Sequence, residues 1–121
     1  MKYMLLIHED EAAWTKAREG QMAAIMAEYR QLTEQLKANG QYVTGSQLQP
    51  TTTATSVRVR DGKRVVTDGP FAETREQLGG YYLIDVPNLD DALAIAARIP
   101  SARFGTIEVR PLVEARVPAP A

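Results

Sequence analysis

The sequence predicts an α+β fold in which one antiparallel sheet is covered on one face by two helices. Short segments with the apolar character of strands alternate with two longer segments of helical periodicity, in the order β, α, β, β-hairpin, β, α, β. Each helical segment lies between two strands, and the hairpin is inserted between the two halves. This order is the split βαβ arrangement of ferredoxin-like folds. Right-handed crossovers place both helices on the same face of the sheet.

The first third of the chain predicts one strand and one long helix. Residues 3–8 form a compact apolar run without polar alternation, which indicates a strand buried on both faces. Residues 12–39 carry a helical apolar stripe that ends at the helix-stop signal Asn39-Gly40. Gly20 interrupts the early part, so residues 11–18 could form a separate turn or short helix. The stripe consists of Met22, Ile25, Met26, Tyr29, Leu32 and Leu36.

The middle of the chain predicts three further strands. Residues 41–49 indicate a strand with an irregularity at Gly45, and a polar, threonine-rich connection follows it. Residues 55–60 and 63–67 flank the dipeptide Asp61-Gly62, which is the strongest short-range signal for a β-hairpin.

The last third predicts a strand, a short helix and a final strand. Residues 81–86 are apolar on both faces. Asn88 is a good N-cap for a helix that stops at Pro100. Within the strand 106–111, one face carries Ile107 and Val109, and the opposite face carries Thr106, Glu108 and Arg110.

Length and composition indicate one soluble domain. The 121 residues predict a single domain over the whole chain, with a frayed tail over residues 115–121. The formal net charge of −1 provides no basic footprint for nucleic acid or an anionic membrane. The absence of cysteine excludes disulfides and thiolate metal sites, and the single histidine excludes a multi-histidine metal site within one chain. We therefore expect no metal or other cofactor.

The N-terminal apolar run predicts neither export nor a membrane anchor. It spans about six residues, whereas the apolar core of a signal peptide needs roughly 7–15. No run approaches the ~18 apolar residues of a membrane span. These features favour a cytoplasmic location.

The two strands that are apolar on both faces predict an assembly. Helices can cover only one face of the sheet, so the other face would expose a large apolar patch in a monomer. A homodimer that packs sheet against sheet, forming a dimeric α/β barrel, is the simplest way to cover that patch.

Residues 65–80 contain the densest group of chemically distinctive side chains in the chain. A β-branched strand leads into Asp68-Gly69-Pro70, a tight-turn signal, and Phe71 after the turn has the character of a buried residue. In a structural role, the Asp68 carboxylate would accept hydrogen bonds from backbone N–H groups two residues on. In a functional role, Asp68 would be a general base or a ligand anchor at the mouth of the barrel.

Two acidic residues follow this turn. Glu73 and Glu76 are three residues apart and could share one face of a helical turn, where paired carboxylates either divide acid and base roles or bind a divalent cation. For at least one of them, we expect an exposed loop in which Arg75 is the salt-bridge partner. Glu73 is the stronger functional candidate because it lies closer to the turn.

Three further candidates lie on strands. Glu108 and Arg110 would face the barrel interior, either as an ion pair that sets the register of the dimer or with Arg110 binding a substrate carboxylate. His8 ends the first strand and is a candidate for proton transfer near neutral pH, although a lone histidine is more often structural.

The predicted hairpin is basic. Arg58, Arg60, Lys63 and Arg64 lie on it, either as a solvated surface or as a docking surface for a partner.

The segment 68–82 resembles the hallmark of DGPF-domain proteins, within the YCII-related family. It begins Asp68-Gly69-Pro70-Phe71 and ends Gly79-Gly80-Tyr81-Tyr82. The resemblance extends to the opening residues 1–7, to Asn39-Gly40 and to residues 99–101 and 105–111. One departure is Arg75, where the family more often has lysine.

The resemblance implies a dimeric α+β barrel and a largely uncharacterised function. Members of the family are often encoded beside extracytoplasmic-function sigma factors, which implies a regulatory association. The wider YCII group includes proteins similar to muconolactone isomerase and a dehydrochlorinase, with a His–Asp pair proposed as catalytic. The family histidine falls near Tyr29 and the family aspartate at Ile99, so this chain keeps neither.

Two functional hypotheses follow. The first is a cleft between the sheet and the partner subunit that binds a small, anionic ligand and supports proton transfer of the lactone isomerase type. The cleft would be lined by His8, Asp68, Phe71, Glu73, Tyr81, Glu108 and Arg110. The second is a non-catalytic accessory protein that contacts an extracytoplasmic-function sigma factor.

Overall fold

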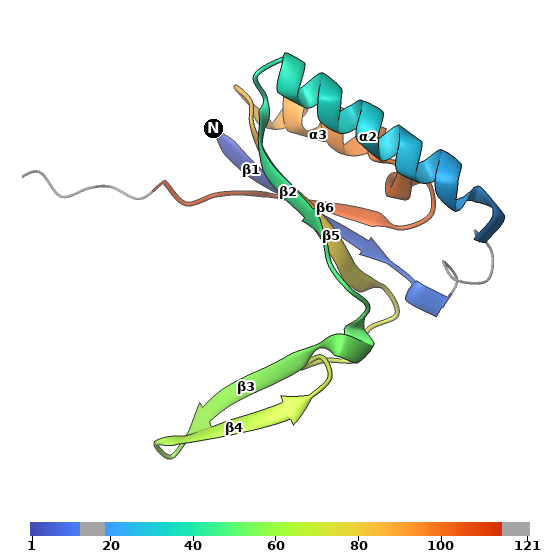
Figure 1. The fold of residues 1–121 in the computed structure, drawn as a ribbon. Coiled ribbons are helices and arrows are strands. Elements are labelled where there is room, and N and C mark those ends of the chain that lie inside the picture. Colours follow the sequence, from blue (N-terminus) through green and yellow to red (C-terminus); the bar gives the residue numbers. More distant parts are fainter. Residues whose placement is uncertain (13–18, 115–121) are drawn as a thin grey trace, which may run out of the picture.

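The computed structural model describes residues 1–12 and 19–114 and confirms the predicted fold class. Four antiparallel strands form a sheet in the order β2-β5-β1-β6, and helices α2 and α3 lie together on one face of it (Figure 1). The strands are β1 (Lys2–Glu9), β2 (Tyr42–Gln47), β5 (Gln77–Asp85) and β6 (Thr106–Pro111). The helices are α2 (Met22–Ala38) and α3 (Leu89–Arg98). The strands that each helix connects are not paired directly, because one other strand lies between them.

The hydrophobic core lies between the sheet and the two helices. In β1, alternate residues Tyr3, Leu5 and Ile7 are buried, as a strand with one face on the core requires. Ile107 and Val109 of β6 pack against the same core, as their alternation predicted. The helices contribute the remaining core residues that the helical periodicity selects: Ile25, Leu32, Leu36, Ala92, Ile95 and Ala96.

Local signals end α2 and begin α3. After α2, Gly40 adopts a positive φ of 68°, and the backbone N–H of Gln41 donates to the carbonyl of Leu36 at 2.9 Å. Before α3, the side chain of Asn88 accepts a hydrogen bond of 2.9 Å from the backbone N–H of Asp91. Both the stop at Asn39-Gly40 and the Asn88 cap were predicted.

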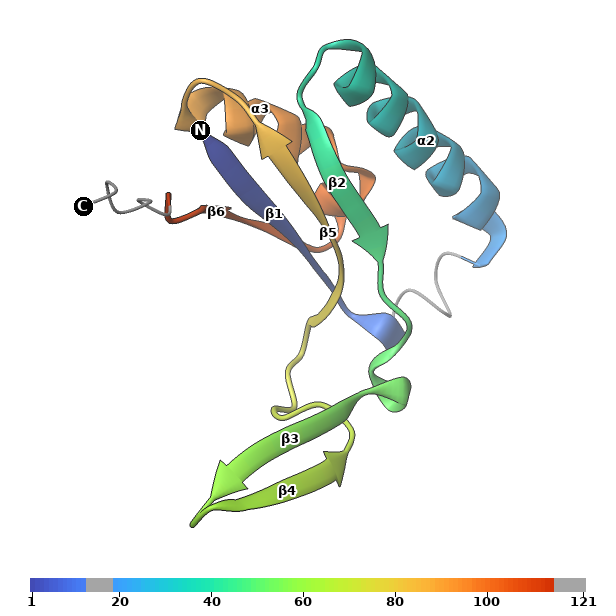
Figure 2. The ribbon, with the colours of Figure 1, turned by 60° about the vertical axis from the view of Figure 1, so that its left-hand side comes forward.

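The predicted hairpin is confirmed and forms a separate two-stranded sheet. It consists of β3 (Thr55–Arg60) and β4 (Lys63–Asp68), joined by Asp61 and Gly62 with φ values of 53° and 72°. Two consecutive positive φ values match the twist of a two-residue hairpin. Figure 2 shows the hairpin projecting away from the main sheet and the helices.

Two details of the strands differ from the predictions. The irregularity in β2 lies at Val43, where the register shifts, and not at Gly45. Gly45 instead allows close approach of β5, because a Cβ there would lie 2.9 Å from the carbonyl oxygen of Tyr81. β5 begins at Gln77, four residues before the predicted start, because Gly79 and Gly80 take part in the strand around a bulge.

Two predictions fall outside the described residues: most of the separate turn or helix over residues 11–18, and the frayed tail over residues 115–121. In the part of the chain that the structure describes, no helix has the length and apolar character to cross a membrane.

Candidate functional site

A cavity of about 640 Å³ lies between α2 and the sheet, toward the β2 edge. We call it the helix-side cavity, and its volume lies in the range of small-molecule sites. Helix α2 presents Met26, Tyr29 and Thr33 to it, since spacings of three and four residues place side chains on one face of a helix. Other walls come from β1, β2 and β5 and their flanking residues, including Ile7, Glu9, Glu11, Tyr42, Leu48 and Tyr82.

A chain of hydrogen bonds connects this cavity to two buried or partly buried groups. The hydroxyl of Ser101 donates to Oε1 of Glu9, and it is also hydrogen-bonded to the hydroxyl of Tyr29. A serine hydroxyl has one proton, so Tyr29 must be the donor in its bond to Ser101. In this chain of hydrogen bonds, Tyr29 therefore donates to Ser101 and Ser101 donates to Glu9.

Three structural elements position the side chains that form these hydrogen bonds. Tyr29 lies on α2, and Glu9 is the last residue of β1, on the same side of the strand as Ile7. Pro100 ends α3 and begins a 3-10 turn (Pro100–Arg103) that holds Ser101 fully buried. Burial raises the pKa of the Tyr29 hydroxyl to about 12, and the nearby Glu9 carboxyl adds to this rise.

A second tyrosine is arranged in the same way. The hydroxyl of Thr33 donates to the backbone carbonyl of Tyr29 at 2.9 Å, so the 2.9 Å bond between Thr33 and Tyr82 must be donated by Tyr82. Burial raises the pKa of the Tyr82 hydroxyl. The Tyr82 ring stacks against the Tyr29 ring with centroids 6.4 Å apart, and Tyr42 meets it edge-on at 6.3 Å.

The described residues contribute only acidic charged side chains to the cavity wall. Glu9 and Glu11 line the cavity, whereas no lysine, arginine or histidine does so among the described residues. Glu11 accepts hydrogen bonds from the backbone N–H and the hydroxyl of Thr51, at 2.9 and 2.8 Å. This contact ties the connection after β2 to the start of the segment that follows β1.

Four of the residues predicted as a site lie together, but on the opposite face of the sheet. His8, Glu108, Arg110 and Tyr81 belong to the face that the helices leave open, as the pairing of β1 with β5 and β6 shows. Nε2 of His8 lies 3.3 Å from Oε1 of Glu108. Tyr81 also borders the helix-side cavity, while its neighbour Tyr82 points toward the helices.

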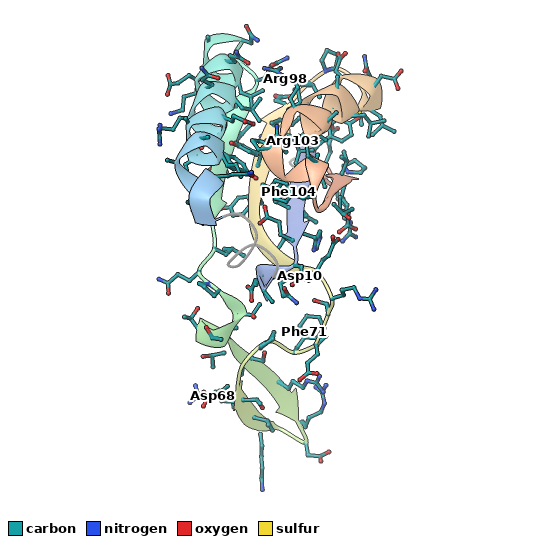
Figure 3. The ribbon with its side chains drawn as sticks, turned by 90° about the vertical axis from the view of Figure 1, so that its right-hand side faces the viewer. Asp10, Asp68, Phe71, Arg98, Arg103 and Phe104 are labelled. Carbon is teal, nitrogen blue, oxygen red and sulfur yellow. The ribbon has the colours of Figure 1, made fainter. Side chains whose placement is uncertain are left out.

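Asp68 and Glu73 lie elsewhere, at the base of the hairpin. They border a second, more open hollow of about 530 Å³ together with Thr51, Thr52 and Thr74. Figure 3 shows Asp68 and Phe71 far from the helices. The seven predicted site residues therefore do not converge on one cavity within the described chain.

The expectation that Phe71 is buried is wrong. Its side chain is 81% exposed. Hydrogen bonds to the start of the hairpin hold the turn before Phe71 in a position that leaves this side chain in solvent. The backbone N–H of Gly69, at a φ of 96°, donates to the carbonyl of Ala54 at 2.7 Å, and the Ser56 hydroxyl donates to the Gly69 carbonyl at 2.8 Å.

Of the two arrangements considered for Glu73 and Glu76, the structure has the exposed loop, in which Glu73 is exposed, and it lacks the hydrogen bond expected at Asp68. The residue two positions after Asp68 is Pro70, which has no N–H to donate, and in the described chain the Asp68 carboxylate accepts no hydrogen bond. Glu73 and Glu76 share no helical face, because residues 71–76 are not helical. Glu76 instead accepts a hydrogen bond of 2.8 Å from the hydroxyl of Thr106.

The sequence did not indicate a functional role for the residues that meet at the helix-side cavity. Tyr29 was assigned to an apolar stripe, Glu9 to the acidic end of a strand, and Ser101 to no role. The available signal was a tyrosine and a threonine four residues apart on an apolar helix face, which is unusual for a fully apolar core. Among the described residues, no group of three or more histidine, aspartate or glutamate side chains could hold a metal ion.

Comparison with known proteins identifies the family. The family model of the YCII-related domain matches residues 1–116. An uncharacterized protein of Rhizobium meliloti (strain 1021) is 38% identical over 117 residues, which cover 93% of this chain and 92% of that protein. Both matches extend over the elements that build the sheet, the helices and the cavity. The chain belongs to the YCII-related domain family.

Proposed function

We propose that the protein binds a small molecule in the helix-side cavity and takes a proton from it, with Glu9 as the final proton acceptor. The observation that carries this proposal is the hydrogen-bonded chain from Tyr29 through Ser101 to Glu9, which begins at the cavity wall. Such a chain allows a proton to leave a ligand without a permanent charge on a tyrosine.

The proposed step moves three protons in one direction. The ligand gives its proton to the hydroxyl oxygen of Tyr29, Tyr29 passes its own proton to Ser101, and Ser101 passes its own to Oε1 of Glu9. The products are a ligand anion and a protonated Glu9, while both hydroxyl groups are restored. The raised pKa of Tyr29 disfavours the phenolate, so this transfer is easier than a step in which Tyr29 ionises alone.

The resemblance to the wider YCII group supports the location. The position of the histidine proposed as catalytic in that group falls near Tyr29, which lines the cavity here. Proton abstraction followed by return of the proton to another carbon is isomerisation, the reaction class that those relatives suggest. The predicted residues His8, Asp68 and Glu73 lie outside this cavity and have no part in the proposed step.

The experiment has two stages. Lactones and β-dicarbonyl compounds, which are small carbon acids, are first screened by ¹⁵N–¹H NMR, and we expect binders to shift the amide signals of Tyr29, Ser101 and Tyr82. Binders are then incubated with the protein in D₂O, and deuterium uptake into the ligand is followed by ¹H NMR. Y29F and S101A should each slow this exchange by at least about 100-fold, the usual contribution of a positioned acid–base group, while binding persists.

Two control variants test the alternative site. D68N and E73Q alter the hollow at the base of the hairpin and should leave the exchange rate unchanged. Exchange at the wild-type rate in Y29F would refute the proposed proton transfer through Tyr29. Binders that shift the amides of residues 68–74 instead of those of Tyr29 and Ser101 would refute the helix-side cavity as the binding site.

The open face of the sheet supports a homodimer as part of this proposal. Met4, Leu6 and Leu83 lie on this face and are only partly buried in the single chain. A second copy packed against them would cover these apolar side chains and enclose the His8–Glu108 pair, giving the dimeric barrel that the family resemblance implies.

A second candidate role is association with an extracytoplasmic-function sigma factor. The feature that favours it is the basic face of the hairpin, where Arg58, Arg60 and Lys63 are exposed side by side. Reversing the charge of Arg58 and Arg60 to glutamate should abolish co-purification with a sigma factor encoded in the same genome. Co-purification that persists unchanged in this variant would count against the hairpin as the docking surface.

A further inference from the structure

We infer that the helix-side cavity takes a small organic ammonium ion, an amine with an apolar or aromatic body. This inference rests on the proposed ligand-binding role of the cavity and is independent of the proton transfer. Three separate properties of the cavity wall carry it: the direction of its hydrogen bonds, the sign of its charged groups and its aromatic surface.

Two tyrosine hydroxyl groups at the cavity wall are arranged as acceptors toward a ligand. The Ser101 hydroxyl donates its proton to Glu9, so Tyr29 is the donor in its bond to Ser101. The Thr33 hydroxyl donates to the Tyr29 carbonyl, so Tyr82 is the donor in its bond to Thr33. Both tyrosine oxygens therefore offer lone pairs to a ligand and no proton. A ligand that donates hydrogen bonds matches this wall, and a ligand that only accepts them does not.

The charged side chains that the described residues contribute to the wall have one sign. Glu9 is partly buried, and in the described part of the chain it forms no ion pair with a cationic side chain. A partly buried acidic group is favoured by a cationic partner, which the ligand would supply. An anionic ligand would instead meet the negative charge of Glu9. Arg110, the residue that suggested an anion, lies on the opposite face of the sheet.

The aromatic surface suits the same ligand. Tyr29, Tyr82 and Tyr42 form a continuous wall, with Tyr82 in contact with both neighbours. The faces of such rings attract ammonium groups. The chain itself provides an example, because Nζ of Lys37 lies 5.3 Å from the centroid of the Tyr42 ring.

The test compares three probes that share one body and differ in charge: 2-phenylethylamine, 2-phenylethanol and phenylacetate. Each is titrated into the full-length protein near pH 7, and binding is measured from the NMR shifts of the Tyr29, Ser101 and Tyr82 amides. We expect the amine to bind at least about tenfold more tightly than the alcohol, a difference of about 1.4 kcal/mol, and phenylacetate to bind more weakly than both.

Two variants locate the preference. In E9Q, the advantage of the amine over the alcohol should disappear, while the affinity for the alcohol stays within about twofold of the wild-type value. In E108Q, an acidic side chain on the opposite face of the sheet is neutralised, and the advantage should persist. Circular dichroism confirms that each variant is folded, and the comparison of the three probes on the wild-type protein needs no variant.

The outcomes distinguish a failure of the inferred ligand class from a failure of the proposed function. If the alcohol or phenylacetate equals the amine, or if none of the three shifts the cavity amides, the ligand class is wrong. The proposed function then still stands if neutral carbon acids bind in the cavity, and it fails if no compound of that screen does. An advantage of the amine that survives in E9Q would also overturn the inference.

Discussion

The hydroxyl group of Tyr29 is hydrogen-bonded to Ser101, 72 residues further along the chain. This contact joins α2 to the 3-10 turn after α3, and through Ser101 it continues to Glu9 at the end of β1. One serine side chain thus connects α2 and the turn after α3 to the end of β1, at the edge of the helix-side cavity. Its position makes it both structural and central to the proposed proton transfer.

Replacing Ser101 by alanine should destabilise the protein by about 1–3 kcal/mol, because it leaves the partly buried Tyr29 hydroxyl and Glu9 carboxyl without their shared partner. Urea unfolding measures this change. Ser46→Ala is the matched control, since Ser46 is exposed on β2, and it should change the free energy of unfolding by less than about 0.5 kcal/mol. Equal stability of S101A and S46A would contradict the structural role.

The raised pKa of Tyr29 predicts a loss of stability at alkaline pH. Between the ordinary tyrosine pKa of 10.0 and about 12, the unfolded chain releases this proton while the folded chain keeps it. The folded state then binds more protons, so the free energy of unfolding falls as the pH rises through this window, by about 3 kcal/mol in all. Y29F should lack this part of the decline.

The measurement is urea unfolding at a series of pH values from 9 to 12, combined with the absorbance of the phenolate form. Tyr82 also has a raised pKa and contributes a decline of the same sign, so Y82F provides the comparison. The prediction is wrong if the difference in stability between the wild type and Y29F stays constant across the window.

Local signals predicted the elements of this fold, because their causes lie within a few residues. Asp61-Gly62 supplies the positive φ values of a hairpin, and Asn88 supplies a hydrogen bond to a helix start three residues away. The alternation in Thr106–Pro111 predicted which face of β6 meets the core. Each of these inferences depends on backbone geometry that a short sequence already determines.

The candidate site could not be predicted in the same way, because it depends on contacts between distant residues. Ser101 meets Glu9 across 92 positions and Tyr29 across 72, and no local pattern reveals that a 3-10 turn brings them together. The turn at Gly69 was recognised, but its outward direction depends on bonds to Ala54 and Ser56, which left Phe71 exposed. A distinctive sequence motif was therefore a poor guide to the position of the cavity.

Gly105 should be intolerant of any side chain. A Cβ at this position would lie 2.2 Å from the carbonyl oxygen of His8 and 3.2 Å from that of Ser101, and both are backbone atoms that cannot move independently. We expect Gly105→Ala to cost about 1–3 kcal/mol or more in unfolding free energy. Gly79→Ala is the control, because its nearest neighbour would lie at an ordinary contact distance of 3.9 Å. Similar melting temperatures for the two variants would show that the backbone near Ser101 adapts more easily than its packing suggests.

The open face of the sheet provides the last prediction, a homodimer that a single charge can dissociate. Leu6 lies at the centre of this face, between Tyr81 of β5 and Glu108 of β6. Light scattering coupled to gel filtration should give the mass of two chains for the wild type and of one chain for Leu6→Glu, because a buried, unpaired carboxylate at an interface is costly. Leu93→Glu places the same charge on an exposed position of α3 and should remain dimeric. A wild-type protein that elutes with the mass of one chain at micromolar concentration would refute the proposed barrel, and the apolar side chains of the open face would then require a different partner.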